Sequence, residues 1–544
     1  MKKPLKIFTA FAAAGVLSMA TLPLAACSNN QTELVLRVSN WEEYIDLGGW
    51  KDDELIDIDN PFLPDSEGII GNNSLIDDFT EWFNSGNHGF TIKVEYSTFG
   101  TNEDLYNRLN LGDTYDLICP SDYLIMQLLN EGKAEKYSES FHDPSIETNY
   151  YARNVSPYID GIFEENGWKE YAACYMLGTT GIVYNPEMVT PEDASSWSVL
   201  KNSTYKRQVT VKDNVRDSYF AALGIHNAEE LLSDEITEER RNSLLNSTDD
   251  ETIASALEIL KDIKNNVYSF ETDSGKSDMI TGKVVANYQW SGDGVYIMDQ
   301  ADEDETNPVE LWYSVPDECT NLWFDGWIML KDGIAGNEQK KIAAEAFVNF
   351  LSRPDNAIRN MYYIGYTSAI ADDTVFNYLD WNYGAVFDPE DDYYDGELLE
   401  ICEYDLSYFF GEGYSIYIDA SQIEIDLENA TPQKLKLGEE YGNDTYYLVY
   451  PTPEKVSRGR QVFAQYPHRS VIDRSVVMLD FGDRLSAINR MWINVRCLAV
   501  KDFNPAVVWS VVGILLAGTV AIILYRFRYQ IFYRRPDKIF TNKK

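Results

Sequence analysis

Between residues 34 and 130 the chain alternates strand-forming and helix-forming segments, and this alternation constrains the fold more than any other feature. The expected strands are 34–39, 90–96 and 116–119. The expected helices are 75–83, 102–111 and 122–130, the first of them capped by Ser74. Strands that alternate with helices are typical of an α/β fold with a substantially parallel sheet.

Polar-tipped side chains follow two of these strands. Trp41 and Tyr44 come after the first strand, and Ser121 and Tyr123 come after the third. In open α/β sheets, ligands bind beyond the carboxyl ends of the strands. We therefore expect these four side chains to lie at the same edge of the sheet, beside a ligand.

Composition narrows the class of ligand. The 544 residues include 88 Asp and Glu against 45 Lys and Arg, which gives a formal net charge of -43, while 13% are aromatic. So many aromatic residues exclude a disordered acidic tail, and the acidity disfavours a nucleic-acid partner. With 4 His and no CxxC motif, neither a metal site nor a redox site is expected. An acidic, aromatic-rich globular protein suits a cationic organic ligand.

The N-terminal residues 1–27 are typical of an export signal. Basic residues precede an apolar stretch, which ends in LAAC at Cys27 and is followed by polar residues. This end resembles the lipobox of bacterial lipoproteins, in which the Cys is lipidated. An ordinary signal peptide with a chance Cys is the alternative. We expect a lipid anchor at Cys27, at the cell membrane, with the following residues outside the cell.

The C-terminal region is also apolar. Residues 505–525 have the length and composition of a transmembrane helix, and residues 526–544 are basic. The positive-inside rule then places this tail in the cytoplasm. The alternative is a helix buried in the core. If the segment does span the membrane, it could serve either as an anchor or as an element that docks on the permease. Five Cys lie between the two ends, so one disulfide is possible outside the cell.

Seven sequence blocks resemble the spermidine/putrescine-binding proteins of polyamine ABC transporters, in the family's order. The blocks are NWEEY (40–44), YSTFGTNEDLYNRL (96–109), DLICPSDY (116–123), GTTGIVYN (178–185), YQWSGDG (288–294), LWFDGW (322–327) and IGY (364–366). They extend over roughly residues 34–370, and a weaker match follows at about 465–497. The order and number of the blocks make the resemblance specific, although each block alone is weak.

The resemblance implies a two-lobed periplasmic-binding-protein-like α/β fold whose lobes are joined by crossing segments. The implied divisions are lobe 1 at 28–176, lobe 2 at 177–322, and at 323–504 a return to lobe 1 with the C-terminal family segment. Two insertions depart from the family, near 46–73 and 371–463. The second is too long for a plain loop, so we expect structure of its own. Within it, residues 388–400 are acidic and favour a solvated surface over a calcium loop.

The resemblance also implies a ligand site. Its expected residues are Trp41, Glu43, Tyr44, Ser121, Tyr123, Asp217, Trp290, Trp323, Asp325 and Tyr366. Carboxylates would accept hydrogen bonds from ligand ammonium groups, and aromatic faces would attract the charges and contact the methylenes. Asp325 and Asp217 are the expected ammonium acceptors, with Glu43 as a third acid. Trp290 and Trp323 would line the site.

The match is weaker around residues 212–219. Asn214 stands where the family usually has a second acid, and the amide keeps an acceptor oxygen without the charge. Asp213 could supply that charge instead under a shifted alignment. Glu42 replaces a small hydroxyl residue and could restore a charge from the other side. Glu42, Asp213 and Asn214 are therefore additional candidates for ligand binding.

The expected function is capture of a polyamine, spermidine or putrescine, and delivery to an ABC permease and its ATPase for import. Binding and release need no cofactor, no metal and no chemical change, so the chain is not expected to be an enzyme. One alternative is a binding protein for another cationic amine or metabolite. A second is a surface glycoside hydrolase with paired carboxylates. A third, a sensor subunit, is disfavoured by the short basic tail.

Overall fold

The computed structural model describes residues 33–304, 308–385, 399–436, 446–497 and 505–532. The strands and helices expected between 34 and 130 are present. The strands are β1 (Glu33–Trp41), β2 (Thr91–Phe99) and β3 (Leu117–Ile118), and the helices are α1 (Leu75–Ser85), α2 (Asn102–Leu111) and α3 (Asp122–Asn130). Ser74 caps α1 by accepting a hydrogen bond from the backbone N–H of Asp77. Strand β1 pairs in parallel with both β2 and β3.

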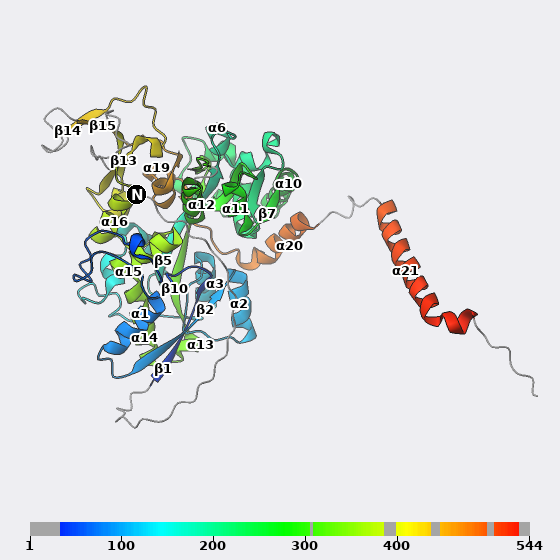
Figure 1. The fold of residues 1–544 in the computed structure, drawn as a ribbon, viewed down its shortest axis with the longest axis horizontal. Helices are drawn as coiled ribbons and strands as arrows, with labels where there is room; N and C mark the ends of the chain where they lie inside the picture. Colours follow the sequence, from blue (N-terminus) through cyan, green and yellow to red (C-terminus); the bar gives the residue numbers. More distant parts are fainter. Residues whose placement is uncertain (1–32, 305–307, 386–398, 437–445, 498–504, 533–544) are drawn as a thin grey trace, which may run out of the picture.

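Two sets of parallel strands are joined by a pair of long antiparallel strands. The second set consists of β6 (Val209–Lys212), β7 (Ser269–Glu271) and β8 (Ala286–Trp290). The connecting strands are β5 (Ala172–Tyr184) and β10 (Thr320–Leu330), which pair with each other along most of their length. The sheet runs in the order β2-β1-β3-β10-β5-β8-β6-β7. Figure 1 shows the first set with its helices below and the second set above, linked by β5 and β10.

Helices pack on each set of strands and form two hydrophobic cores. Those of the first core include α14 (Glu338–Leu351) and α15 (Pro354–Ile364), and those of the second include α7 (Val215–His226), α10 (Asp250–Asn266) and α20 (Leu485–Arg496). The second core contains residues far apart in sequence, such as Phe220 and Ile488. The first core is not confined to the first lobe, because it also includes second-lobe residues such as Met279 and Val295.

The segment expected to have structure of its own contains a small separate sheet. Its strands are β12 (Glu400–Asp405), β13 (Ser415–Asp419), β14 (Gln433–Lys436) and β15 (Tyr446–Pro451), in the order β13-β12-β15-β14. Helix α16 (Asp373–Tyr383) precedes this sheet and contacts β13. Most of the acidic stretch at 388–400, like Cys27, lies outside the described residues.

The transmembrane helix expected at 505–525 is wrong. Helix α21 (Pro505–Phe532) lies apart from the two lobes in Figure 1, and no helix of the described residues is long and apolar enough to cross a membrane.

The cysteines of the described residues are free. Cys119, Cys174, Cys319 and Cys402 are buried, and Cys497 is exposed. The possible disulfide is therefore not formed among them. Burial raises the pKa of the Cys119 and Cys174 thiols well above the usual value, so these side chains act as small apolar groups in the core.

Candidate functional site

Asp325 is the centre of the site on the first lobe. It lies on β10, with 6% of its surface exposed, and a β-bridge pairs its backbone with that of Ser121. The Ser121 hydroxyl donates to Oδ1 of Asp325 at 2.6 Å, and the Tyr44 hydroxyl donates to Oδ2 at 2.8 Å. Side chains from three separate segments thus meet at one carboxylate, as expected from the ends of β1 and β3.

The Asp325 carboxylate has neutral hydrogen-bond donors only. Burial raises its pKa to about 6, although the hydrogen bonds from Ser121 and Tyr44 oppose this rise. No Lys or Arg of the described residues forms an ion pair with it. A buried carboxylate without a cationic partner is costly to ionise. A ligand ammonium would supply the missing positive charge.

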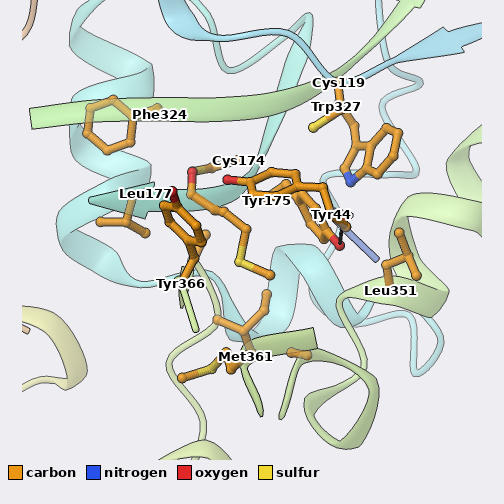
Figure 2. Close-up of a cluster of buried hydrophobic side chains, with 14 of the residues drawn as sticks. Tyr44, Cys119, Cys174, Tyr175, Leu177, Phe324, Trp327, Leu351, Met361 and Tyr366 are labelled. Atoms are coloured by element: carbon orange, nitrogen blue, oxygen red, sulfur yellow. Dashed lines mark hydrogen bonds between the residues drawn. The ribbon is translucent and has the colours of Figure 1, made fainter. Parts of the chain in front are cut away.

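Aromatic rings extend from Asp325 toward the second lobe. We call Tyr44, Tyr366, Trp323 and Trp290 the aromatic slot. The ring centroids of Tyr44 and Tyr366 lie 5.5 Å apart, and those of Tyr366 and Trp323 lie 5.4 Å apart, both edge to face. Figure 2 shows Tyr44 and Tyr366 in one buried cluster with Tyr175. Burial, and then the charges of Asp293 and Asp325, raise the pKa of the Tyr366 phenol well above its usual value.

Two glycines allow these rings to pack so closely. A Cβ atom on Gly292 would lie 2.3 Å from the Tyr366 ring, and one on Gly178 would lie 2.6 Å from the Trp323 ring. Neither distance is tolerated between real atoms, so only glycine fits. The glycines in the WSGDG and GTTG blocks therefore have a direct role in shaping the slot.

Asp217 is the corresponding acid on the second lobe. It lies in the first turn of α7, is buried, and accepts a hydrogen bond from the Trp290 indole at 3.2 Å. Burial raises its pKa to about 6, although the positive charges of Lys212 and Arg216 oppose the rise. Asp217 and Asp325 thus resemble each other in burial and in their shifted pKa.

Lys212 was not expected at the site. It is the last residue of β6, and its side chain is only 1% exposed. Its Nζ lies 4.1 Å from the centroid of the Trp290 ring, donates to the carbonyl oxygen of Thr272 at 3.0 Å, and pairs with Asp293 at 3.2 Å. The sequence feature that could have indicated this role is a lysine at the end of a strand, one residue before the acid Asp213. From the sequence, only Asp213, Asn214 and Asp217 of this segment are predicted to bind the ligand.

Asp293 differs from the other two carboxylates because cations surround it. Lys212 pairs with one of its oxygens, and Lys276 lies 3.5 Å from the other. Burial alone would raise the pKa of the Asp293 carboxyl, but the two lysines outweigh it and the pKa is lowered. Asp293 therefore stays ionised and is already neutralised within the protein.

Arg216 covers another predicted ligand residue. Its guanidinium lies 3.8 Å from the centroid of the Tyr123 ring, and it donates to the carbonyl oxygen of Leu479 at 2.7 Å. Tyr123 donates in turn to Glu103 at 3.2 Å. Since Arg216 belongs to the second lobe and Tyr123 to the first, this cation–π contact joins the lobes beside the slot. One face of Tyr123 is occupied by the protein itself.

The remaining candidates are placed less centrally. Trp41 packs on Phe99 at 4.8 Å, and Glu42 and Glu43 are exposed at the end of β1. Asp213 pairs with Arg496 of α20 at 2.7 Å. Asn214 caps α7 by accepting the backbone N–H of Arg216 at 2.8 Å. Asp213 and Asn214 therefore both have structural partners within the protein.

Comparisons with known proteins identify the family of this chain. The family model of bacterial extracellular solute-binding proteins matches residues 74–372. The chain belongs to this family. It is 29% identical over 278 residues to the spermidine/putrescine-binding periplasmic protein of Salmonella typhimurium, covering 51% of this chain and 70% of that protein. A putrescine/agmatine-binding protein of Pseudomonas aeruginosa is 24% identical over 284 residues, covering 50% and 70%.

A solved structure supports the fold independently. A Listeria monocytogenes protein assigned to a spermidine/putrescine ABC transporter superimposes with a TM-score of 0.52 at 20% identity, covering 85% of this chain and 98% of that protein. At this identity the likeness concerns the fold alone. It confirms the two-lobed α/β architecture, and the family description confirms a location outside the cell.

Proposed function

We propose that this chain is an extracytoplasmic substrate-binding protein that captures a polyamine and delivers it to an ABC permease and its ATPase for import. The observation that carries this proposal is Asp325, a buried carboxylate that is held by two hydroxyls and faces aromatic rings without a cation of its own. Carboxylates and ring faces are the groups that replace water around an ammonium. The names of the relatives from Salmonella and Pseudomonas support the same class of ligand.

The proposed pose spans both lobes. One ammonium binds Asp325, the methylenes lie against Tyr366, Trp323 and Trp290, and a second ammonium binds Asp217. Because these groups come from both lobes, the ligand binds the closed arrangement more tightly than an open one. It therefore shifts the population toward closure. No bond is made or broken in this cycle.

Calorimetry of the purified protein with a panel of amines tests the proposal. Putrescine or spermidine should bind with a measurable heat, and the affinity should fall as salt is raised, because the contacts are ionic. A diamide or a sugar of similar length is the matched neutral control. If no amine binds, and the protein instead releases sugar from glycans, the transport function is wrong and the hydrolase alternative replaces it.

We further propose that Cys27 carries a lipid anchor that holds the lobes at the outer face of the cell membrane. The LAAC sequence ahead of polar residues supports this assignment. Metabolic labelling with a radioactive fatty acid should mark the wild-type protein and leave the Cys27→Ser variant unlabelled. Equal labelling of both proteins would contradict it.

A further inference from the structure

The second lobe carries its own ammonium group inside the proposed polyamine site. Lys212 is almost completely buried, and its Nζ lies 4.1 Å from the Trp290 ring centroid and 3.2 Å from Asp293. A carboxylate and an indole face are the environment that a bound polyamine ammonium would need. The position next to Trp290 is therefore occupied by a cation of the protein.

The carboxylates around the slot fall into two groups. Asp325 and Asp217 accept hydrogen bonds from neutral side chains, namely the Tyr44 and Ser121 hydroxyls and the Trp290 indole. Neither forms an ion pair within the described residues. Asp293, in contrast, is paired with Lys212 and approached by Lys276. The charges of Lys212 and Arg216 act on Asp217 without pairing with it. Asp325 and Asp217 are thus the two carboxylates without an ion pair that could receive ligand charges.

Two like charges repel each other strongly in a buried site, because little water is present to screen them. A third ammonium on the ligand would lie between Asp325 and Asp217, near the Trp290 ring, which the Lys212 ammonium also contacts. It would find no unpaired carboxylate there and would be repelled by Lys212. Repulsion of the wrong ligand is as effective for selectivity as attraction of the right one.

We propose that Lys212 occupies the place of a third ligand ammonium and makes this site selective for a diamine over a triamine. This inference rests on the proposed function and specifies its substrate class. A diamine of the putrescine type would place its charges at Asp325 and Asp217. Lys212 is then a specificity-determining residue, and Asp293 and Lys276 position its ammonium.

Binding of putrescine and spermidine to the wild type and to Lys212→Met tests this role. The wild type should bind putrescine at least about tenfold more tightly than spermidine. The variant removes the internal ammonium and leaves Asp293 available, so that preference should fall by about tenfold or reverse. Lys283→Met is the matched control, because Lys283 lies in the same lobe, paired with Asp278 on the surface. It should keep the wild-type preference.

A second variant guards against misfolding. In Lys212→Met the Asp293 carboxylate keeps Lys276, but the double variant Lys212→Met/Asp293→Asn removes both members of the buried pair. It should bind both amines with similar affinity, since repulsion and the extra acceptor are both lost. Thermal unfolding with and without ligand shows whether each variant is folded.

Two results would overturn the inference. A wild type that binds spermidine as tightly as putrescine, or a folded Lys212→Met variant with an unchanged preference, would overturn the role of Lys212 while leaving polyamine binding intact. A wild type that binds neither amine would overturn the proposed function as well. The two failures are therefore distinguishable in one set of isotherms.

Discussion

Asp325 is buried and Asp293 is 13% exposed, and the partners of these two acids differ in charge. Asp325 on β10 accepts hydrogen bonds from two neutral hydroxyls, and its pKa is raised to about 6. Asp293, in α12 (Ser291–Glu303), is surrounded by Lys212 and Lys276, and its pKa is lowered. The pKa values of these two acids shift in opposite directions, because Asp293 has cations next to it within the protein and Asp325 has none.

This difference indicates how a carboxylate becomes a ligand group. An acid paired inside the protein contributes to the packing of its lobe and has no charge left for a ligand. An acid held only by neutral donors is oriented for binding but still lacks a counter-charge. The ligand completes the second arrangement and has nothing to add to the first.

The largest effect is expected from Asp325→Asn. The amide keeps the shape but removes the charge that faces the ligand ammonium. Loss of one member of a buried charged pair costs about 2–5 kcal/mol, so the affinity for putrescine should fall by about 30-fold to several thousandfold in calorimetry. Asp160→Asn, which removes a partly exposed acid paired with Lys169, is the control. If Asp325→Asn kept the full affinity, the lack of a cationic partner would not distinguish a ligand-binding carboxylate from a structural one such as Asp293.

Lowering the pH from 7.5 to 5 should weaken binding to a comparable degree. Because burial raises the pKa of both Asp325 and Asp217 to about 6, these groups are ionised at pH 7.5 and mostly protonated at pH 5. The amine stays charged over this range, so affinity should fall about tenfold per pH unit for each acid that must ionise. In Asp217→Asn the slope should decrease. An affinity independent of pH between 5 and 7.5 would contradict the proposed roles.

The smallest effect is expected from Glu43→Gln. Glu43 is exposed at the end of β1, where water and salt screen its charge. The affinity should change by about threefold at most, and the change should vanish in high salt. Glu81→Gln, an exposed change on α1, is the matched control. If the affinity fell more than about tenfold in Glu43→Gln but not in Glu81→Gln, an exposed acid would contribute as much to ligand binding as a buried one.

Most of the first-lobe half of the site could be predicted from the sequence. Tyr44 and Ser121 follow strands whose carboxyl ends share one edge, so their meeting at this edge follows from local patterns. Trp41 and Tyr123 have other partners, Phe99 and Arg216. Asp325 is predicted as a ligand group from the LWFDGW block, and the structure places it within hydrogen-bond distance of Tyr44 and Ser121. The hydrogen bonds from Tyr44 and Ser121 could not be predicted, because they depend on the register of β10 against its neighbours.

The second-lobe half was predicted less well because its partners are distant in sequence. Asp213 is a plausible ligand group by its position, but Arg496 comes from the far C-terminal segment and pairs with it. Asn214 is the N-cap of α7, and this role depends on where the helix begins. Lys212 reads as an ordinary surface lysine at the end of a strand. Only the fold shows that its ammonium is buried.

The sequence by itself determined the α/β alternation, the family and the acids and rings that surround the site. These properties depend on local propensity and on residue types at particular positions. The tertiary structure decided which carboxylates are already neutralised, because this depends on residues such as Asp293 and Lys276 brought next to Lys212 by folding. It also corrected the transmembrane helix. Charge state in a buried site is a property of the surroundings, and the surroundings are assembled only in three dimensions.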